Sequence, residues 1–266
     1  MTTVRPHPEI RLKTPAEMDA MAVAGRAAAR TLRAVAAAAA PGVSLLELEE
    51  IALATLEAAG AKPSLKGYHP GFSRTPYEYA TCLSINDEVI HGTPRKKLLK
   101  EGDILGIDVV ANIDGWHADT AITVPVGTVS PRAKKLMKVT EESMWLGIEQ
   151  CLPGNTLGDV GNAIQRHVEK NGCSILKNMV GHGVGTAVHE PGLDVANFGR
   201  PKSGTRLVPG MTFCVEPMVT AGRGDMKHRK DDPWAVVTKD GSIGAHFEHT
   251  VGVTETGYRV LTLLED

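Results

Sequence analysis

The first sixty residues alternate apolar and polar positions with the spacing of two helices. In each stretch a hydroxyl side chain, Thr14 or Ser44, is followed three residues later by a glutamate, which is the pattern of a capping box. The first helix is rich in alanine and is expected over 15–40, where a proline–glycine pair ends it. The second carries its apolar residues at helical spacing and ends at Gly60.

From about Ala80 the pattern changes to short strands rich in β-branched residues and separated by turn signals. A second pair of helices is expected over 131–151 and 156–170, and glycine-rich strands and loops follow to the end. The order helix pair, strands, helix pair, strands predicts an α+β fold with two similar halves. We expect 1–13 to be an N-terminal arm and 14–266 to be one domain.

The composition is that of a globular protein and excludes several classes. Of the 266 residues, 42% are hydrophobic and 23% charged, which excludes a disordered chain. The 29 basic and 31 acidic side chains leave a net charge of −2, so no global attraction to nucleic acid or anionic membranes is expected. No signal-peptide core is visible, and the longest apolar run, 34–40, is too short to span a membrane. We expect a cytoplasmic protein.

The four cysteines include no C-x-x-C pair. This spacing argues against a disulfide framework and against a thiolate zinc site, and it fits a reducing cytosol. The cysteines are Cys82, Cys151, Cys173 and Cys214.

The candidate chemistry starts with two aspartates in one predicted hairpin. Asp108 and Asp119 are equally distant from a turn centred on Ile113 and Asp114, so a regular hairpin places their side chains opposite each other. Facing carboxylates repel, and a divalent cation is the natural compensation. The alternative is that both aspartates point into solvent.

Three more polar residues interrupt apolar or glycine-rich surroundings. His182 lies between glycines, Glu216 ends an apolar strand, and Glu248 leads into another strand. A carboxylate in a buried strand is uncommon unless it is paired or binds metal. Carboxylates combined with an imidazole suit divalent Mn, Fe, Co or Zn ions.

These segments, in this order, resemble the type I methionine aminopeptidases of the pita-bread fold. The likeness runs from about Leu12 to the end of the chain. It rests on the hairpin and on five short motifs, which are Ser84–Gly92, Gly181–Gly185, His189-Glu190-Pro191, Val215–Met218 and Phe247–Thr250. The resemblance implies two pseudo-symmetric halves with a curved antiparallel sheet covered by helices.

The resemblance also implies a centre of two divalent metal ions (Co, Mn, Fe or Zn). Asp108 binds one ion, His182 and Glu216 bind the other, and Asp119 and Glu248 bridge them. The implied reaction removes the N-terminal methionine from nascent proteins and peptides by attack of metal-activated water, with a small second residue preferred.

By the same resemblance, two further histidines and Glu216 take part in catalysis. Glu216 is the proton shuttle, His189 polarises the scissile carbonyl, and His91 contacts the amide nitrogen. The methionine side chain is expected among Tyr68, Cys82 and Trp234.

Two departures from the family pattern leave the shape of that pocket open. Extra residues within 69–79 are expected to form a flap over it, and Val188 stands where relatives often carry an aromatic residue.

The expected partners are the N-terminal segments of nascent polypeptides, and the protein is expected to be a monomer. A transient contact with the ribosome stays open. Neither a membrane nor a specific nucleic acid is expected as a partner. One alternative function is an Xaa-Pro aminopeptidase of the same fold, but such enzymes usually have a further N-terminal domain. The other is a non-enzymatic pita-bread binding protein, which typically lacks metal ligands.

His117 and His249 stay ambiguous, and the basic runs 95–100 and 227–230 are predicted to be solvated loops.

Overall fold

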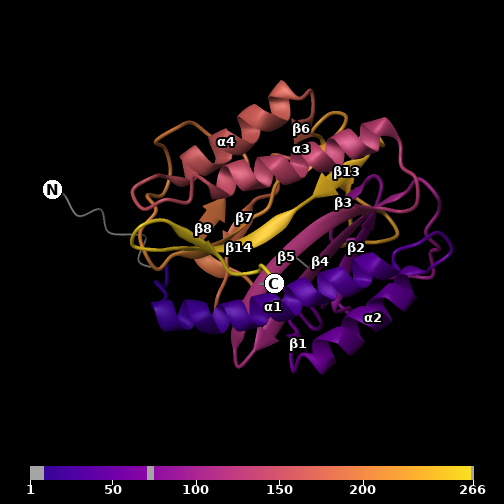
Figure 1. Ribbon diagram of the computed structural model, residues 1–266. Helices are drawn as coiled ribbons and strands as arrows, with labels where there is room; N and C mark the ends of the chain where they lie inside the picture. Colours follow the sequence, from indigo (N-terminus) through magenta and orange to yellow (C-terminus); the bar gives the residue numbers. More distant parts are fainter. Residues whose placement is uncertain (1–8, 71–74, 265–266) are drawn as a thin grey trace.

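Helices cover one side of a curved sheet in the computed structural model, which describes residues 9–70 and 75–264. The four helices of these ranges form two pairs, at opposite ends of the sheet (Figure 1). They are α1 (Pro15–Ala38), α2 (Leu45–Ala58), α3 (Pro131–Ile148) and α4 (Leu157–Lys170).

The helix starts follow from local capping chemistry. Thr14 and Ser44 accept hydrogen bonds from the backbone N–H groups of Glu17 and Glu47, whose carboxylates accept from the cap N–H groups in return. Both predicted capping boxes are therefore confirmed. α1 and α3 end two and three residues before the predicted ends, within the usual uncertainty of helix termini.

The main sheet of the described residues has nine strands and is antiparallel throughout. Its path runs β1 (Lys62–Pro63), β4 (Ile104–Ile113), β5 (Trp116–Pro125), β14 (Glu248–Val253), β9 (Thr212–Val215), β7 (Gly181–Gly183) and β8 (Glu190–Val195). Beside this path, β2 (Thr81–Ile85) pairs with β4, and β15 (Tyr258–Val260) pairs with β14.

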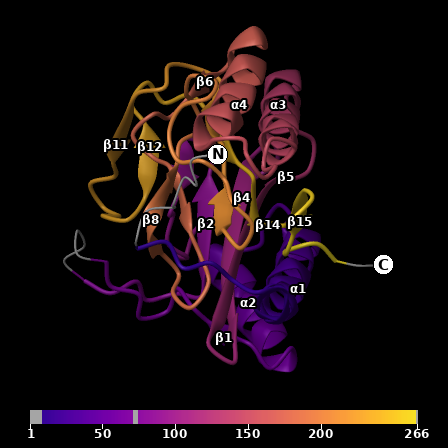
Figure 2. The same cartoon turned by 90° about the vertical axis from the view of Figure 1, so that its left-hand side faces the viewer.

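Two three-stranded sheets complete the strand structure. One has the order β13 (Gly244–His246), β10 (Met218–Thr220), β6 (Ser174–Ile175). The other has the order β11 (Met226–His228), β12 (Val236–Thr238), β3 (Glu88–Ile90). Figure 2 shows both helix pairs on one side of the molecule and β11 and β12 on the other.

Each helix pair has its own hydrophobic core. Leu45 of α2 and Ile107 of β4 belong to the core under α1 and α2, whereas Ile164 of α4 and Phe213 of β9 belong to the core under α3 and α4. The two halves meet where β5 pairs with β14. The predicted α+β class with two similar halves is confirmed.

The register of the β4–β5 hairpin differs from the prediction. The turn is Asp114-Gly115, so Asp108 lies opposite Ala121, and Asp119 lies opposite Val110. Both turn residues have positive φ, 52° and 86°, as a type I′ turn requires, and an Asp-Gly pair adopts this geometry readily. The aspartates are thus diagonal rather than direct neighbours, and the shift of two positions keeps them on one face.

None of the helices in the described ranges has the length and apolar character needed to cross a membrane. All four cysteines are buried free thiols. Residues 1–8 of the predicted arm lie outside the described residues, and Lys13 at its end is buried.

One glycine fixes how closely α1 approaches the C-terminal strand region. A Cβ atom on Gly25 would lie 1.9 Å from the carbonyl oxygen of Leu261. We expect Gly25→Ala to lower the free energy of unfolding by about 2 kcal/mol, because overpacking outweighs the gain in helix propensity. Urea unfolding measures the change. Gly257→Ala is the control, since its Cβ meets open space; an equal effect of both variants would contradict this account of the packing.

Candidate metal centre

Strand alternation sends the predicted ligands to the sheet face that the helices leave uncovered. On β4, Ile107 and Val109 point into the helix-covered core, so Asp108 between them points to the opposite face. On β14, Val251 and Val253 join the core under α3 and α4, so Glu248 also faces away from the helices. We call this uncovered face the site face.

His182 and Glu216 approach the aspartates from the other half of the fold. The Nε2 atom of His182 on β7 lies 3.6 Å from Oδ2 of Asp119 and 3.6 Å from Oε1 of Glu216. The ligand atoms of Asp119, His182 and Glu248 all lie within 4.8 Å of one another. All five residues predicted as ligands therefore meet at one place, where β4, β5, β7, β9 and β14 converge.

His246, which the sequence analysis did not single out, joins the same group. Its Nε2 atom lies 3.5 Å from Oε2 of Glu216 and 3.7 Å from Oε2 of Glu248. Ligand atoms of Asp108, His246 and Glu248 form a second set within 4.8 Å. The available signal was the two-residue spacing of His246 and Glu248, which places both on one face around the core residue Phe247.

The site carries more buried charge than its own hydrogen bonds can satisfy. Among the described residues, six buried side-chain atoms lack a hydrogen-bond partner, and five of them belong to this group. These five are Asp108 Oδ1, Asp119 Oδ1, Glu216 Oε1, Glu248 Oε1 and His246 Nε2; the sixth is Asn197 Oδ1. Unpaired buried carboxylate atoms are costly, and a bound cation satisfies them.

The pKa values of the acidic groups are shifted for the same reason, because several carboxylates are buried close together. Burial raises the pKa of Asp119 well above its ordinary value, and the carboxylates of Glu248, Asp108 and Glu216 raise it further. Burial also raises the pKa values of Glu216 and Glu248, and neighbouring acids again add to the effect. By contrast, burial lowers the pKa of His182 to about 3, which keeps its imidazole neutral, the form that binds metal.

His189 and His91 flank this group. The ring of His189 lies 3.8 Å from that of His182 between centroids, and its Nδ1 atom is 2.8 Å from the Tyr68 hydroxyl. His91 sits in the left-handed region with φ 59°, a conformation that non-glycine residues adopt rarely and that often marks a functional site. Burial lowers the pKa of His91 to about 3, so the ring is neutral.

The comparisons with known proteins agree with this geometry. The model of the metallopeptidase family M24 matches residues 19–255. Methionine aminopeptidase 1 of Bacillus subtilis is 44% identical over 250 residues, which cover 94% of this chain and 98% of that protein. The chain belongs to the methionine aminopeptidases of metallopeptidase family M24.

Structural comparison gives the same family. A crystal structure of methionine aminopeptidase from Thermotoga maritima superposes with a TM-score of 0.91 at 42% identity, covering 96% of this chain and 100% of that one. A prolidase from Pyrococcus furiosus has a TM-score of 0.74 at 20% identity and covers 96% of this chain and 66% of that chain, which shows a shared fold alone. The expected pita-bread fold is confirmed, and membership of M24 makes this chain a metal-dependent hydrolase.

Threonine hydroxyls hold the ligand-bearing strands of this M24 chain together. The Thr250 hydroxyl accepts from the backbone N–H of Asp119 at 2.9 Å and lies 2.8 Å from the Asp119 carbonyl. Thr120 donates to the backbone carbonyl of Glu248 at 2.8 Å. These contacts bridge β5 and β14, whose own pairing covers two residue pairs. The backbones of Asp119 and Glu248 are thereby held in register.

Cys214 lies beside the ligands as a buried free thiol. Its Sγ atom falls within the group of Asp119, His182 and Glu248. Burial and the neighbouring carboxylates raise the pKa of the Cys214 thiol well above its ordinary value. Its Sγ atom is 3.9 Å from the Thr250 hydroxyl.

The loop that carries His189 is tied to the N-terminal segment by a buried ion pair. Lys13 Nζ contacts the carboxylate of Glu190, and only 1% of the Lys13 side chain is exposed. The other oxygen of Glu190 accepts from the backbone N–H of Thr186 at 2.8 Å. The carbonyl of Gly185 accepts from the backbone N–H of His117.

The predicted substrate-pocket residues gather in one cluster next to Asp108. Cys82 lies directly opposite Asp108 across the β2–β4 ladder. The cluster contains Tyr68, Cys82, Trp234, Val188, Tyr77, Tyr79, Leu65 and Val110. The extra segment supplies Tyr77, which packs edge to face on Trp234 at 5.2 Å between centroids. Residues 71–74 of the predicted flap lie outside the described residues.

The basic runs are less solvated than predicted. Arg95 and Arg229 both contact the carboxylate of Glu88, which is buried in β3. Asp232 links the same regions, since it accepts from the Thr93 hydroxyl at 2.6 Å and from the backbone N–H of Trp234 at 3.1 Å. A buried carboxylate requires hydrogen-bond partners, and Asp232 finds them in both segments. Its bonds therefore connect the segment of His91 to that of Trp234.

The two ambiguous histidines have ordinary hydrogen-bond partners. His117 Nδ1 lies 2.9 Å from the Ser64 hydroxyl, and His249 Nδ1 lies 2.8 Å from the Thr262 hydroxyl. The His249 ring also lies 5.1 Å from that of Trp145 on α3. His249 therefore faces the helices.

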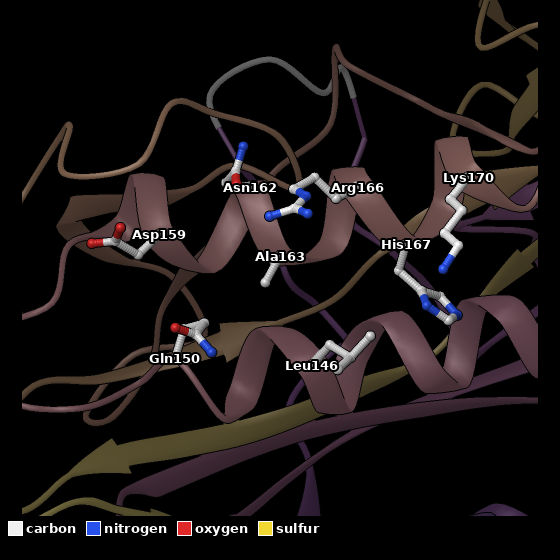
Figure 3. Close-up of a pocket in the computed structure, with 8 residues that line it drawn as sticks. All are labelled: Leu146, Gln150, Asp159, Asn162, Ala163, Arg166, His167 and Lys170. Atoms are coloured by element: carbon white, nitrogen blue, oxygen red, sulfur yellow. The ribbon is translucent and has the colours of Figure 1, made fainter.

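A hollow of about 370 Å³ lies on the helix side, between α3 and α4 (Figure 3). Leu146 and Gln150 line one wall and side chains of α4 the other, among them Arg166 and Lys170. None of the predicted site residues lines it. His167 at its end is 3.0 Å from a carboxylate oxygen of Glu142. The hollow and the candidate metal centre therefore lie on opposite sides of the sheet.

The raised carboxyl pKa values predict how pH affects the metal-free protein. A carboxyl group whose folded pKa is raised takes up a proton on folding, so this stabilising protonation is lost as pH rises from about 4 towards the raised value. We expect the unfolding temperature of chelated protein to fall further below that of Mn-loaded protein between about pH 5 and about pH 8. Thermal scans of both forms measure the gap; a gap independent of pH would contradict the assignment.

Proposed function

We propose that this chain removes the N-terminal methionine from nascent proteins and peptides, with a preference for a small second residue. The observation that carries the proposal is the convergence of the five predicted ligands on one buried site with unpartnered acidic oxygen atoms. The relatives at 42–44% identity support the same activity, since they are named methionine aminopeptidases.

The donor set fits two divalent ions of the Co, Mn, Fe or Zn kind. Glu248 belongs to both groups of close ligand atoms, which supports a bridging role for this carboxylate. Asp108 would hold one ion, His182 and Glu216 would hold the other, and Asp119 and Glu248 would be shared between the two. Two ions held there would supply a water molecule activated near neutral pH and a polarised substrate carbonyl.

The neighbouring side chains position and protonate the peptide. The Tyr68 hydroxyl lies 2.8 Å from Nδ1 of His189. When Tyr68 donates to that nitrogen, the proton of the imidazole is on Nε2, the atom that donates to the scissile carbonyl oxygen. Glu216 takes a proton from the attacking water and passes it to the amide nitrogen that leaves. His91, neutral and held by its unusual backbone conformation, contacts that nitrogen.

The selectivity for methionine follows from the cluster beside Asp108. Trp234, Tyr68 and Cys82 present an apolar surface next to the metal ligands, and Tyr77 supports Trp234 from the side. An unbranched thioether side chain fills such a pocket without polar cost. The proximity of Cys82 to Asp108 aligns the bound side chain with the centre.

We further propose that the enzyme acts as a monomer in the cytoplasm. The four free thiols fit a reducing compartment. Its substrates emerge from the ribosome, so a transient contact between enzyme and ribosome belongs to the proposal, and co-sedimentation of the two tests it.

The direct test is a peptide assay on chelated protein before and after addition of Mn, Fe, Co or Zn. Met-Ala-Ser should be cleaved after the first residue once an ion is restored. Activity that survives chelation would exclude the metal-dependent reaction. Full inactivity with every ion would favour the non-enzymatic alternative.

Peptide selectivity separates the proposal from the Xaa-Pro alternative. We expect the order methionine, norleucine, leucine at the first position, because norleucine replaces the thioether sulfur by a methylene and leucine is branched. Changes of about this size in an apolar pocket alter the rate about 10–200-fold. Rates on Met-Ala-Ser, norleucine-Ala-Ser, Leu-Ala-Ser and Leu-Pro-Ser measure it. If Leu-Pro-Ser is the best substrate, the methionine assignment is wrong and the proline-directed function replaces it.

His189 distinguishes a catalytic side chain from a metal ligand. We expect His189→Ala to lower kcat about 100-fold or more, because a donor to the developing oxyanion is lost, while metal content stays unchanged. Steady-state kinetics and elemental analysis measure both quantities. His167→Ala, in the hollow on the helix side, is the matched control and should keep wild-type kcat. An unchanged kcat in His189→Ala would reduce that residue to a wall of the cleft.

A further inference from the structure

The side chain of His246 has no role in the proposed reaction, although it lies within the centre. Only 3% of the residue is exposed, and its Nε2 atom lacks a hydrogen-bond partner. A buried imidazole nitrogen normally has a partner, so an unpartnered one aimed at acidic oxygen atoms indicates an absent ligand.

The distance from His246 to Glu248, the carboxylate that belongs to both groups of ligand atoms, is too long for a hydrogen bond and fits two neighbouring ligands of one ion. Nε2 lies 3.5 Å and 3.7 Å from the nearest oxygen atoms of Glu216 and Glu248, near or beyond the upper limit for a hydrogen bond. With metal–ligand bonds of about 2.1 Å, two ligands of a tetrahedral ion lie about 3.4 Å apart. His182 has the same relation to its acids, at 3.6 Å from both Asp119 and Glu216.

The backbone holds His246 in this position. Its N–H donates to the Thr123 hydroxyl at 2.9 Å, and the same hydroxyl donates to the His246 carbonyl at 2.8 Å. In the antiparallel ladder of β13 and β10, His246 pairs with Met218, which comes two residues after Glu216. Phe247 is anchored in the core on the opposite side. The ring therefore stays on the site face.

We propose that His246 is a sixth protein ligand of the metal centre, bound through Nε2 to the ion that Asp108 holds. This inference rests on the proposed function, because it assigns a ligand to the same centre. Each ion then has one imidazole, His182 on one side and His246 on the other, with Glu248 close to both. The group of Asp108, His246 and Glu248 within 4.8 Å is the site in question.

A second imidazole changes which ions the centre prefers. Imidazole suits Co, Fe and Zn, whereas an all-carboxylate site suits Mn and Mg. The metal site that Asp108 and His246 share should therefore bind Co²⁺ more tightly than Mn²⁺. The difference in affinity should be larger than in a site made of carboxylates alone. The competing explanation is that His246 only orients Glu216 or Glu248 through a hydrogen bond.

His246→Gln separates the two explanations. A glutamine amide can donate a hydrogen bond to a carboxylate but provides no imidazole nitrogen. His249→Gln is the matched control, since that half-buried histidine directly follows Glu248 in the chain but faces α3. Circular dichroism shows whether each variant is folded, and His246→Ala provides a second variant without any donor.

The readouts are metal binding and imidazole counting rather than activity. Titration calorimetry with Co²⁺ and with Mn²⁺ on chelated protein should show that His246→Gln weakens one of two Co²⁺ sites about 100-fold and the Mn²⁺ sites less. Hyperfine-shifted imidazole N–H signals of the Co²⁺-loaded protein should number two in wild type and in His249→Gln, and one in His246→Gln.

Two imidazole signals in folded His246→Gln, or one signal in wild type, would overturn the proposal. Equal Co²⁺ affinity in wild type and His246→Gln would do the same and would leave His246 an orienting residue at most. The proposed function fails differently, because then wild type binds no ion or leaves Met-Ala-Ser uncleaved whatever the number of imidazoles.

Discussion

The mutual repulsion of four carboxylates, three buried and one half-buried, is the constraint on which the rest of this structure depends. Asp108, Asp119, Glu216 and Glu248 converge on one face of the sheet, and each has an oxygen atom without a partner. Removing these groups from water and crowding them raises their pKa values, which disfavours the charged state in the metal-free protein. Divalent cations resolve this conflict, so folding of the centre and binding of metal are linked.

The fold separates these carboxylates from its hydrophobic cores. Each helix pair covers its own hydrophobic core on one side of the sheet, and strand alternation then directs the acids to the other side. The two halves contribute different ligands and meet at β5 and β14, where hydroxyls of Thr120 and Thr250 add to a short ladder. The side chains proposed for catalysis and for substrate binding surround the same point. A buried ion pair fixes one of the segments that carry them, where Lys13 contacts Glu190 beside His189.

Local patterns predicted much of this arrangement from the sequence. Capping boxes located α1 and α2, because their hydrogen bonds involve residues three positions apart. Period-two alternation placed Asp108 and Asp119 on one face. Their register was wrong by two positions, since symmetric spacing ignored the preference of Asp114-Gly115 for a type I′ turn.

Such local patterns could not predict which residues distant in the sequence lie close together in space. His246 was missed because one histidine at a strand end has many explanations until its neighbours in space are known. Tyr77 lies in the extra segment, where the resemblance offered no alignment, and its packing on Trp234 depends on the fold. The five candidate ligands came from the residue patterns, whereas their assignment to individual ions came from the family resemblance and stays a prediction.

The count of bound ions tests the central claim most directly. Elemental analysis of wild-type protein after loading with Co²⁺ or Mn²⁺ should give two ions per chain, and folded Asp119→Ala should retain fewer than two, because this bridging carboxylate is lost. Asp19→Ala, which removes an exposed carboxylate of α1, should keep both ions. Two ions still bound to Asp119→Ala would contradict the dinuclear centre.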